Sequence, residues 1–492
     1  MSRGESVPQK PIIGSYSTHT EIEERDQANN VVATYVCSPD SGPQERGRVD
    51  VVVPRNTRTY VKSVLNAFLP AGYPHSVTKD YLQYQIYDSL QAFSSSIAGL
   101  LSSRAVLEGI GVGDSHASPT AALLLSVLQD SMGRIATILF AHRLGTSLEP
   151  ECKMYRLAAD IFNDAAMIFD CLSPALPKAS RVALLSLSSV LRSLCGVAAG
   201  SSKASLSAHF ATQGNLGELN AKDSSQETII SLMGMLVGSL VVSHISSQGA
   251  TWIVMIALLA IHLGTNYLAV RAVSMRTLNR QRANLVFSTL FQRLSRLEGS
   301  KTSDSRTEFP TPDEVSLQER VFEKDGVLRW QGDKILGYCQ IGVPLRKILD
   351  LFGQSDETTG SYTGAKSQDF VVLLDIFQEE GYIMWYDEPR KVFLICLKFP
   401  SNTETQLHAW MHALFMAIQV QRGLKDESVI EALARTRRDF RSWAKEYEIF
   451  DNLRRVGWDL DTAALETRSG TRIRTKDGSP GHGEDLEVPW KF

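Results

Sequence analysis

Cysteine is scarce in this sequence, with six among 492 residues, and no two of them form a CxxC pair. This excludes a small disulfide scaffold and leaves a zinc or thioredoxin-type site without support. An excess of charge is missing too, because 51 basic and 54 acidic side chains give a net charge of -3. We therefore expect no nucleic-acid partner that is held by bulk charge.

The usual catalytic motifs are also missing: we find no Walker A, HExxH, GxSxG or EF-hand pattern. The glycine-rich stretch 109–114 is not GxGxxG and lies between apolar segments, so we interpret it as a turn in which Asp114 caps the next helix. We expect no enzyme, catalytic residue, cofactor or metal site. An enzyme would need a convergent site that the sequence does not display.

The ends of the chain lack apolar runs. Residues 1–47 are polar, contain no signal-like apolar segment and are rich in glutamate, so we expect a disordered tail. Residues 466–492 have a similar composition, and we expect a second flexible tail there.

The most informative segment is Thr228–Val270, 43 residues without Asp, Glu, Lys or Arg. The stretch Ser246-Ser247-Gln248-Gly249 divides it into two runs of about 20 residues, the length that crosses a bilayer. We interpret it as a transmembrane hairpin; the alternative is a pair of buried helices in a soluble core. The lone His244 and His262 are expected to form hydrogen bonds between helices.

Four weaker apolar segments precede the hairpin, at 88–107, 119–142, 157–173 and 182–200. We predict a mainly α fold: an integral, multi-pass membrane bundle of about six helices over 48–285, transporter-like in outline, with the lipid bilayer as its partner. A helix end and linker follow at 286–312, and then a small soluble α+β domain at 313–465. Strands at 382–386 and 392–398 and a helix at 404–421 are expected in that domain.

Polar residues interrupt two of the weaker segments. Asp130 and Arg134 stand at i, i+4 around Gly133, loosely like a signature of major facilitator transporters; they either face a cavity or pair at a helix end. Asp160, Asn163 and Asp164 share one helix face, which suits either a proton or cation relay or the solvated face of an interfacial helix.

Two GxxxG motifs, Gly196–Gly200 and Gly234–Gly238, are candidates for helix packing. Between them, we interpret residues 201–227 as a loop. Its polar side chains include His209, Asn220, Lys222, Gln226 and Glu227.

Several short stretches, taken in order, form a recognisable set: LPAGYP at 69–74, GVGD at 111–114, QDSMGR at 129–134, ADIFNDA at 159–165, HFA at 209–211, NAK at 220–222, SQET at 225–228 and NYLAV at 266–270. Together they resemble the root UVB sensitive family, and we expect a fungal-type member. The sequence departs from the expected pattern at Gln129 and Ser131, where a Lys-Asp-Gly-like run would stand.

The resemblance implies a role in vitamin B6 homeostasis and UV-B-related stress signalling, and it supplies no catalytic residues. It adds Asn266 to the candidate polar residues. Our first hypothesis is a transporter-like or sensing membrane protein whose ligand stays unknown. The alternative is a membrane-anchored adaptor that binds a protein partner, or a family paralogue, through its C-terminal domain.

Overall fold

The computed structural model describes residues 20–25, 31–38, 48–53, 68–110, 119–245, 247–297, 309–355, 362–363, 367–423, 427–468 and 470–474. The chain forms two compact units, each treated by itself below. The first comprises 1–81 and 210–230, and the second comprises 82–209 and 231–492.

The first unit contains a three-stranded antiparallel sheet of β1 (Thr20–Arg25), β2 (Val31–Ser38) and β3 (Arg48–Val52). The prediction of a disordered tail over 1–47 is therefore wrong for β1 and β2. The β-branched run in β2 favours an extended strand, and pairing on both sides, Thr34 with Val52 and Glu23 with Thr34, completes its backbone hydrogen bonds.

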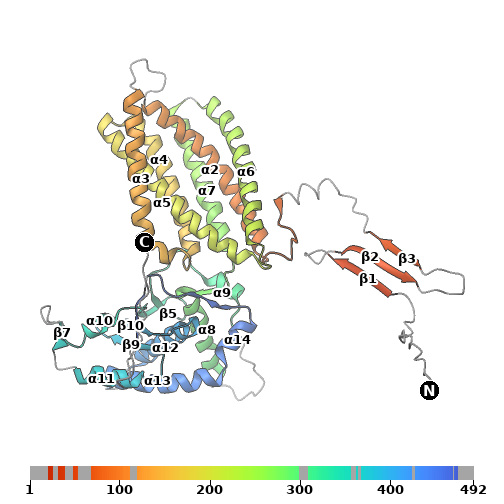
Figure 1. Ribbon diagram of the computed structural model, residues 1–492. Helices are drawn as coiled ribbons and strands as arrows, with labels where there is room; N and C mark the ends of the chain where they lie inside the picture. The colour runs from red at the N-terminus through yellow and green to blue at the C-terminus, as the bar shows by residue number, and fades with distance from the viewer. Residues whose placement is uncertain are drawn as a thin grey trace, which may run out of the picture. The chain divides into compact units, whose positions relative to one another are not determined.

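Six long helices form a bundle and run side by side (Figure 1). Each predicted apolar segment lies in one of them, and the hairpin divides where expected, with Ser247 as the N-cap of the last helix. The helices are α2 (Tyr81–Ile110), α3 (Pro119–Leu148), α4 (Cys152–Leu172, continued by the 3-10 turn Ser173–Ala175), α5 (Lys178–Phe210), α6 (Leu216–His244) and α7 (Gln248–Ala272).

Four stretches of these helices are long and apolar enough to cross a membrane: Leu123–Leu148, Lys178–Phe210, Leu216–His244 and Gln248–Ala272. Their apolar side chains point outward to an unusual degree, since Ile253 is 74% exposed, Ile138 68% and Leu240 63%. A soluble helix turns such residues inward. The bundle is thus apolar on its outer surface, as a lipid-facing surface is.

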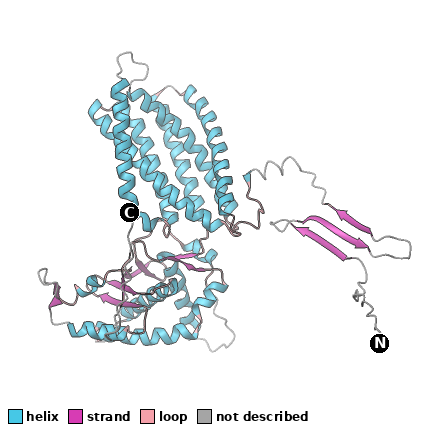
Figure 2. Cartoon of the chain, in the orientation of Figure 1, coloured by secondary structure: helices cyan, strands magenta, loops and turns pink. Residues whose placement is uncertain are grey.

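The C-terminal region combines helices with a small sheet (Figure 2). The central strand β10 pairs in parallel with β6 and β12 and antiparallel with β9, and β5 pairs with β6. The predicted hairpin and helix are confirmed as β9, β10 and α12. The elements are β4 (Thr277–Asn279), α8 (Arg280–Leu297), α9 (Pro312–Gln318), β5 (Val327–Trp330), β6 (Lys334–Ile341), α10 (Leu345–Leu349), β7 (Gln354–Ser355), β8 (Tyr362–Thr363), α11 (Ser367–Ile376), β9 (Tyr382–Asp387), β10 (Val392–Lys398), α12 (Thr403–Arg422), α13 (Val429–Glu446), α14 (Ile449–Arg455), β11 (Asp459–Ala464) and β12 (Arg472–Ile473).

Two predicted boundaries shift. Leu278, Val286 and Phe287 belong to the same buried core as Trp410, so the C-terminal domain begins near β4 and not at 313. The reason is that α8 has an apolar face as well as its basic one. The predicted tail 466–492 begins with ordered structure, because β12 extends the sheet and Arg472 pairs with Glu466 at 2.5 Å. The predicted linker is described only in part, since 298–308 lie outside the described residues.

Candidate functional site

The polar side chains of α4 point into the bundle, towards α2 and α7. Arg156, Asp160 and Asp164 are spaced four residues apart and so share one face of the helix. All three are buried, with less than a tenth of each residue exposed. Charged groups in an apolar bundle must find partners or lose their charge.

Arg156 connects α4 to α2. Its guanidinium donates to Asp160 Oδ1 at 3.0 Å, to Asp88 Oδ1 at 2.6 Å and to Gln91 Oε1 at 3.0 Å. One cation thus holds two carboxylates and an amide in place. We use the name buried polar cluster for seven residues: Asp88, Gln91, Arg156, Asp160, Asp164, His262 and Asn266.

Asp160 is the best-partnered acid of the cluster. Besides Arg156, its Oδ2 accepts from Gln91 Nε2 at 2.8 Å and from Asn266 Nδ2, and it lies 3.5 Å from His262 Nε2. Gln91 Nε2 also lies 2.8 Å from His262 Nε2. Three helices therefore meet at one carboxylate.

Asp164 is the least satisfied acid. His262 Nδ1 lies 2.7 Å from Asp164 Oδ1, but the pair is out of line for a hydrogen bond. Both carboxylate oxygens of Asp164, together with Asn266 Oδ1, are buried without a hydrogen-bond partner. These buried acceptors lack a donor, which a proton or a cationic or hydroxyl-bearing ligand would supply.

A second polar group lies further along α4. Asp170 accepts from Ser102 of α2 at 2.8 Å and from Ser188 of α5 at 2.6 Å, and Arg192 pairs with it. Asn163 lies between the two groups, with its amide 3.4 Å from Ser95 Oγ. One side of α4 is therefore polar over most of its length.

The buried polar cluster contains more acid than base. Asp88, Asp160 and Asp164 supply three carboxylates, against the single cation of Arg156. With His262 neutral the net charge is −2, and with His262 protonated it is −1. A buried net charge is unfavourable, so the cluster favours uptake of a proton or a cation. Among the described residues, no three or more His, Cys, Asp or Glu side chains are grouped to hold a metal ion.

The structure brings together only some of the predicted site residues. Asp160, Asp164 and Asn266 are in the cluster, and Asn163 borders it. Asp114 lies outside the described residues. His209 is buried at the end of α5, where its carbonyl accepts from Arg276 at 3.2 Å.

The prediction that Asp130 and Arg134 face a cavity is wrong. Both are exposed on the outer side of α3, and no ion pair joins them among the described residues. The inward side of this turn is Gly133, where a Cβ would collide with Ser193 of α5. The glycine permits close helix packing, which turns its charged neighbours outward.

The predicted loop 201–227 is mostly helical, because α5 continues to Phe210 and α6 begins at Leu216. Four of its candidate residues lie on α6 in the first unit and are not members of the cluster. Gln226 donates to the carbonyl of Phe68 at 2.6 Å, a role in local structure. The other three are Asn220, Lys222 and Glu227.

The two GxxxG motifs have different surroundings. A Cβ on Gly234 would lie 2.7 Å from Ser96 Cβ, and one on Gly238 would lie 2.8 Å from Leu100 Cδ1, so both glycines pack on α2. A Cβ on Gly196 or Gly200 would meet nothing within 4 Å. Packing is thus confirmed for the motif in α6, and the prediction is wrong for the motif in α5.

This difference predicts opposite effects of one substitution. Gly234→Ala should destabilise the chain by about 1–3 kcal/mol, because the added methyl group forces α6 away from α2. Gly196→Ala should be neutral or stabilise by up to about 1 kcal/mol, through helix propensity alone. Melting temperatures of the detergent-solubilised variants measure this, and equal shifts for the two would contradict the packing.

Four cluster residues were not among the predicted site residues: Asp88, Gln91, Arg156 and His262. A pattern for them exists, since each helix carries a polar pair at helical spacing: 88 and 91 in α2, 156 and 160 in α4, 262 and 266 in α7. His262 was expected to form a hydrogen bond between helices, and its ring does contact Gln91 of α2. His244, for which the same was expected, instead contacts the Leu240 carbonyl of its own helix.

Comparison with known proteins identifies the family. Residues 54–293 match the family model described as the vitamin B6 photo-protection and homoeostasis domain. RUS family member 1 of Dictyostelium discoideum is 38% identical over 61% of this chain and 55% of its own length. Protein root UVB sensitive 3 of Arabidopsis thaliana is 39% identical over 47% of this chain and 52% of its own length. The chain thus aligns with only about half the length of these two relatives.

A third relative aligns more completely. Protein root UVB sensitive 2, chloroplastic, of Arabidopsis thaliana is 30% identical over 72% of this chain and 73% of its own length. No solved structure matches the chain. The matched model covers α2 to α7, which hold the buried polar cluster, and on this similarity the chain belongs to the root UVB sensitive family.

Proposed function

We propose that the chain is an integral membrane protein of vitamin B6 homeostasis, whose helix bundle moves a small polar solute across the bilayer together with a proton. The observation that carries this is the buried polar cluster. Three carboxylates and one arginine lie inside a bundle with an apolar outer surface. Ionisable groups inside membrane bundles mark substrate paths and proton relays.

In this proposal all six helices cross the membrane, including α2 and α4, which carry Asp88, Arg156, Asp160 and Asp164 of the cluster. The 21 residues of α4 extend over about 30 Å, enough for the hydrocarbon core. Its central charges are compatible with insertion, because Arg156 pairs with Asp88 of α2 and with Asp160 inside the bundle. The four apolar stretches supply the lipid-facing surface.

In this proposal Asp160 and Asp164 have different roles. Asp160 binds Arg156, Gln91 and Asn266, and so keeps the three helices together. Asp164 accepts no well-aligned hydrogen bond among the described residues and lies beside His262, so in this proposal it is the group that takes and releases the proton. A B6 vitamer, with its hydroxyl groups and ring nitrogen, would supply the donors that Asp164 and Asn266 lack.

Uptake into proteoliposomes tests this proposal. With an imposed pH gradient, the wild-type chain should accumulate a labelled vitamer such as pyridoxine or pyridoxal. Asp164→Asn should lose the gradient-driven part by at least tenfold, because it removes the proton site and keeps the shape. Asp130→Asn, the same change on the outer face of α3, should transport normally. Uptake no faster than in empty liposomes, or equal in the two variants, would contradict the proposal.

One feature of the C-terminal domain favours the adaptor as a second candidate. A surface groove of about 270 Å³ is lined by the half-buried Phe415 and by polar side chains such as Gln419 and Arg422, a mixture found at protein interfaces. An adaptor predicts that a partner co-purifying with the full chain is lost in Phe415→Asp and retained in Asp164→Asn. The reverse pattern would exclude this role for the groove.

A further inference from the structure

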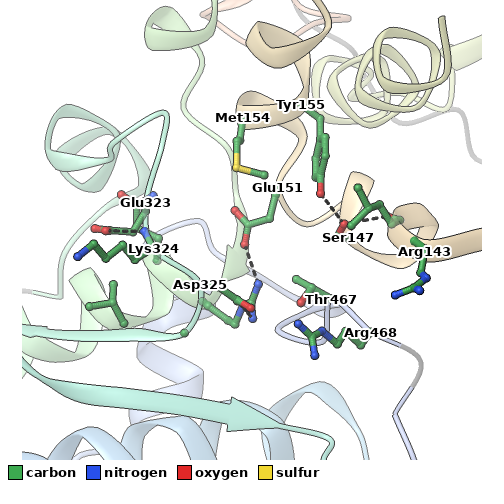
Figure 3. A pocket seen from close by; sticks show the side chains of 15 residues that line it. Arg143, Ser147, Glu151, Met154, Tyr155, Glu323, Lys324, Asp325, Thr467 and Arg468 are labelled. Atoms are coloured by element: carbon green, nitrogen blue, oxygen red, sulfur yellow. Dashed lines mark hydrogen bonds and ion pairs between the residues drawn. The ribbon is translucent and has the colours of Figure 1, made fainter. Parts of the chain in front are cut away.

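A pocket of about 210 Å³ lies where the ends of the bundle helices meet the C-terminal domain. Arg143 of α3, Lys324 before β5 and Arg468 after β11 all line it. Figure 3 shows Lys324 on one side, Arg143 and Arg468 on the other, and Glu151 between them. Residues far apart in the sequence thus place three cations around one cavity.

The acids of this pocket already have cations of their own. Arg280 lies 3.6 Å from Glu151 and pairs with Asp325. Glu323 accepts from Arg329 at 2.7 and 2.9 Å. Burial raises the pKa of Glu151, and Asn279 Nδ2 donates to its Oε2 at 3.0 Å. The acids therefore do not neutralise the other three cations.

Arg143, Lys324 and Arg468 have no side-chain hydrogen bond or ion pair among the described residues. The Nε of Arg280 is buried and has no hydrogen-bond partner there. The hydroxyl groups of Ser147 and Tyr155, 2.8 Å apart, also line the cavity. The pocket thus offers several donors and an excess of positive charge, because its carboxylates are already paired with Arg280 and Arg329.

We infer that this pocket binds a phosphate monoester. Such a group carries up to two negative charges and three acceptor oxygens, which match the three cations and the unpaired guanidinium nitrogen. The same chemistry is found on a phosphorylated small solute and on the headgroup of phosphatidic acid. The inference goes beyond the proposed transport, because it concerns a different site.

The geometry gives such a ligand a second effect. Thr146 Oγ1 of α3 donates to the carbonyl of Thr467 at 2.9 Å, which joins the end of α3 to the segment that carries Arg468. Lys324 comes from the loop that leads into the sheet. A bound phosphate would therefore tie the bundle to the C-terminal domain, and binding should raise the melting temperature of the full chain.

Titration of the detergent-solubilised full chain with O-phosphoethanolamine, followed by calorimetry, tests the soluble form of the ligand. Arg143→Gln and Arg468→Gln should each weaken binding about tenfold, because each removes a charge-assisted hydrogen bond. Lys324→Gln should weaken it as well. Arg134→Gln is the matched control, since it removes an exposed arginine from the same helix outside the pocket.

A second arm tests the lipid form, using nanodiscs with and without phosphatidic acid and the same four variants. Binding of either ligand that depends on Arg143 and Arg468 supports the inference, and the arm that binds identifies the source. The inference is overturned if neither ligand binds, or if Arg134→Gln loses as much affinity as the pocket variants. Unchanged melting temperatures without ligand establish that the variants fold, and no result depends on transport.

Discussion

Glu319→Gln is expected to destabilise the chain by about 3–5 kcal/mol, the cost of removing one partner from a buried ion pair. Glu319 accepts from Lys153 of α4 at 2.5 Å and from Arg282 of α8 at 2.7 Å. The exposed fractions of the three side chains are only 5%, 7% and 2%. Glutamine keeps the shape and removes the charge, so two buried cations would be left facing each other.

The comparison variants make this expectation specific. Glu314→Gln also removes a carboxylate next to an arginine, Arg293, but that pair is largely exposed, so the change should cost less than about 1 kcal/mol. Lys153→Met should cost less than Glu319→Gln, because the Arg282 pair survives. Thermal unfolding in detergent gives the ranking, and equal losses for Glu314→Gln and Glu319→Gln would show that the buried network is not decisive.

The pH dependence follows from the same contacts. Burial alone would raise the pKa of Glu319, but Lys153 and Arg282 outweigh burial and hold that pKa below the usual carboxyl value. A lowered pKa in the folded state means that the stabilisation is complete above the unfolded-state pKa of about 4.3. It is lost as the pH falls through the folded-state pKa. Glu319→Gln should therefore lose less stability than the wild type over that acidic range.

Local composition predicted much of the fold. The uncharged run over 228–270 corresponds to the second half of α6 and nearly all of α7, and its small polar break lies where α6 ends and α7 begins. Two apolar runs joined by the polar turn 387–390 likewise predicted β9 and β10. The N-terminal sheet was missed, because its glutamate-rich composition resembles disorder and pairing between strands is a tertiary property.

The site was predicted less well, and two residue pairs show why. Asp130 with Arg134 and Arg156 with Asp160 have the same i, i+4 spacing, but the first pair lies outside the bundle and the second inside. Spacing fixes which residues share a face of a helix and not which way that face turns. In α3 a small residue decides which face turns inward, because the face that carries Gly133 packs closely on α5. The partners on α2 and α7 lie 65 or more residues away in the sequence, so the polar pair on each helix does not show which helices meet.

Arg156→Gln is expected to have the second large effect, also about 3–5 kcal/mol, because Asp88 and Asp160 would lose their buried cation. Free thiols offer the measurement. Cys152 and Cys171 are buried at the two ends of α4, so a thiol-reactive dye should label them only when this helix opens. Labelling of these two cysteines, measured separately from the partly exposed Cys37 and Cys195, should begin at a lower temperature in Arg156→Gln than in the wild type.

Arg134→Gln provides the matched control, since it makes the same substitution at an exposed arginine with no ion pair to Asp130 among the described residues. Its labelling should begin at nearly the same temperature as in the wild type, because a surface substitution changes stability by less than about 0.5 kcal/mol. A third variant, Asp88→Asn with Arg156→Gln, should recover part of the loss, because it removes one of the two stranded negative charges. If the double variant is as unstable as the sum of the single changes, Arg156 and Asp88 do not act as a pair. In that case the charge balance of the cluster does not hold α2 against α4, and packing alone must do so.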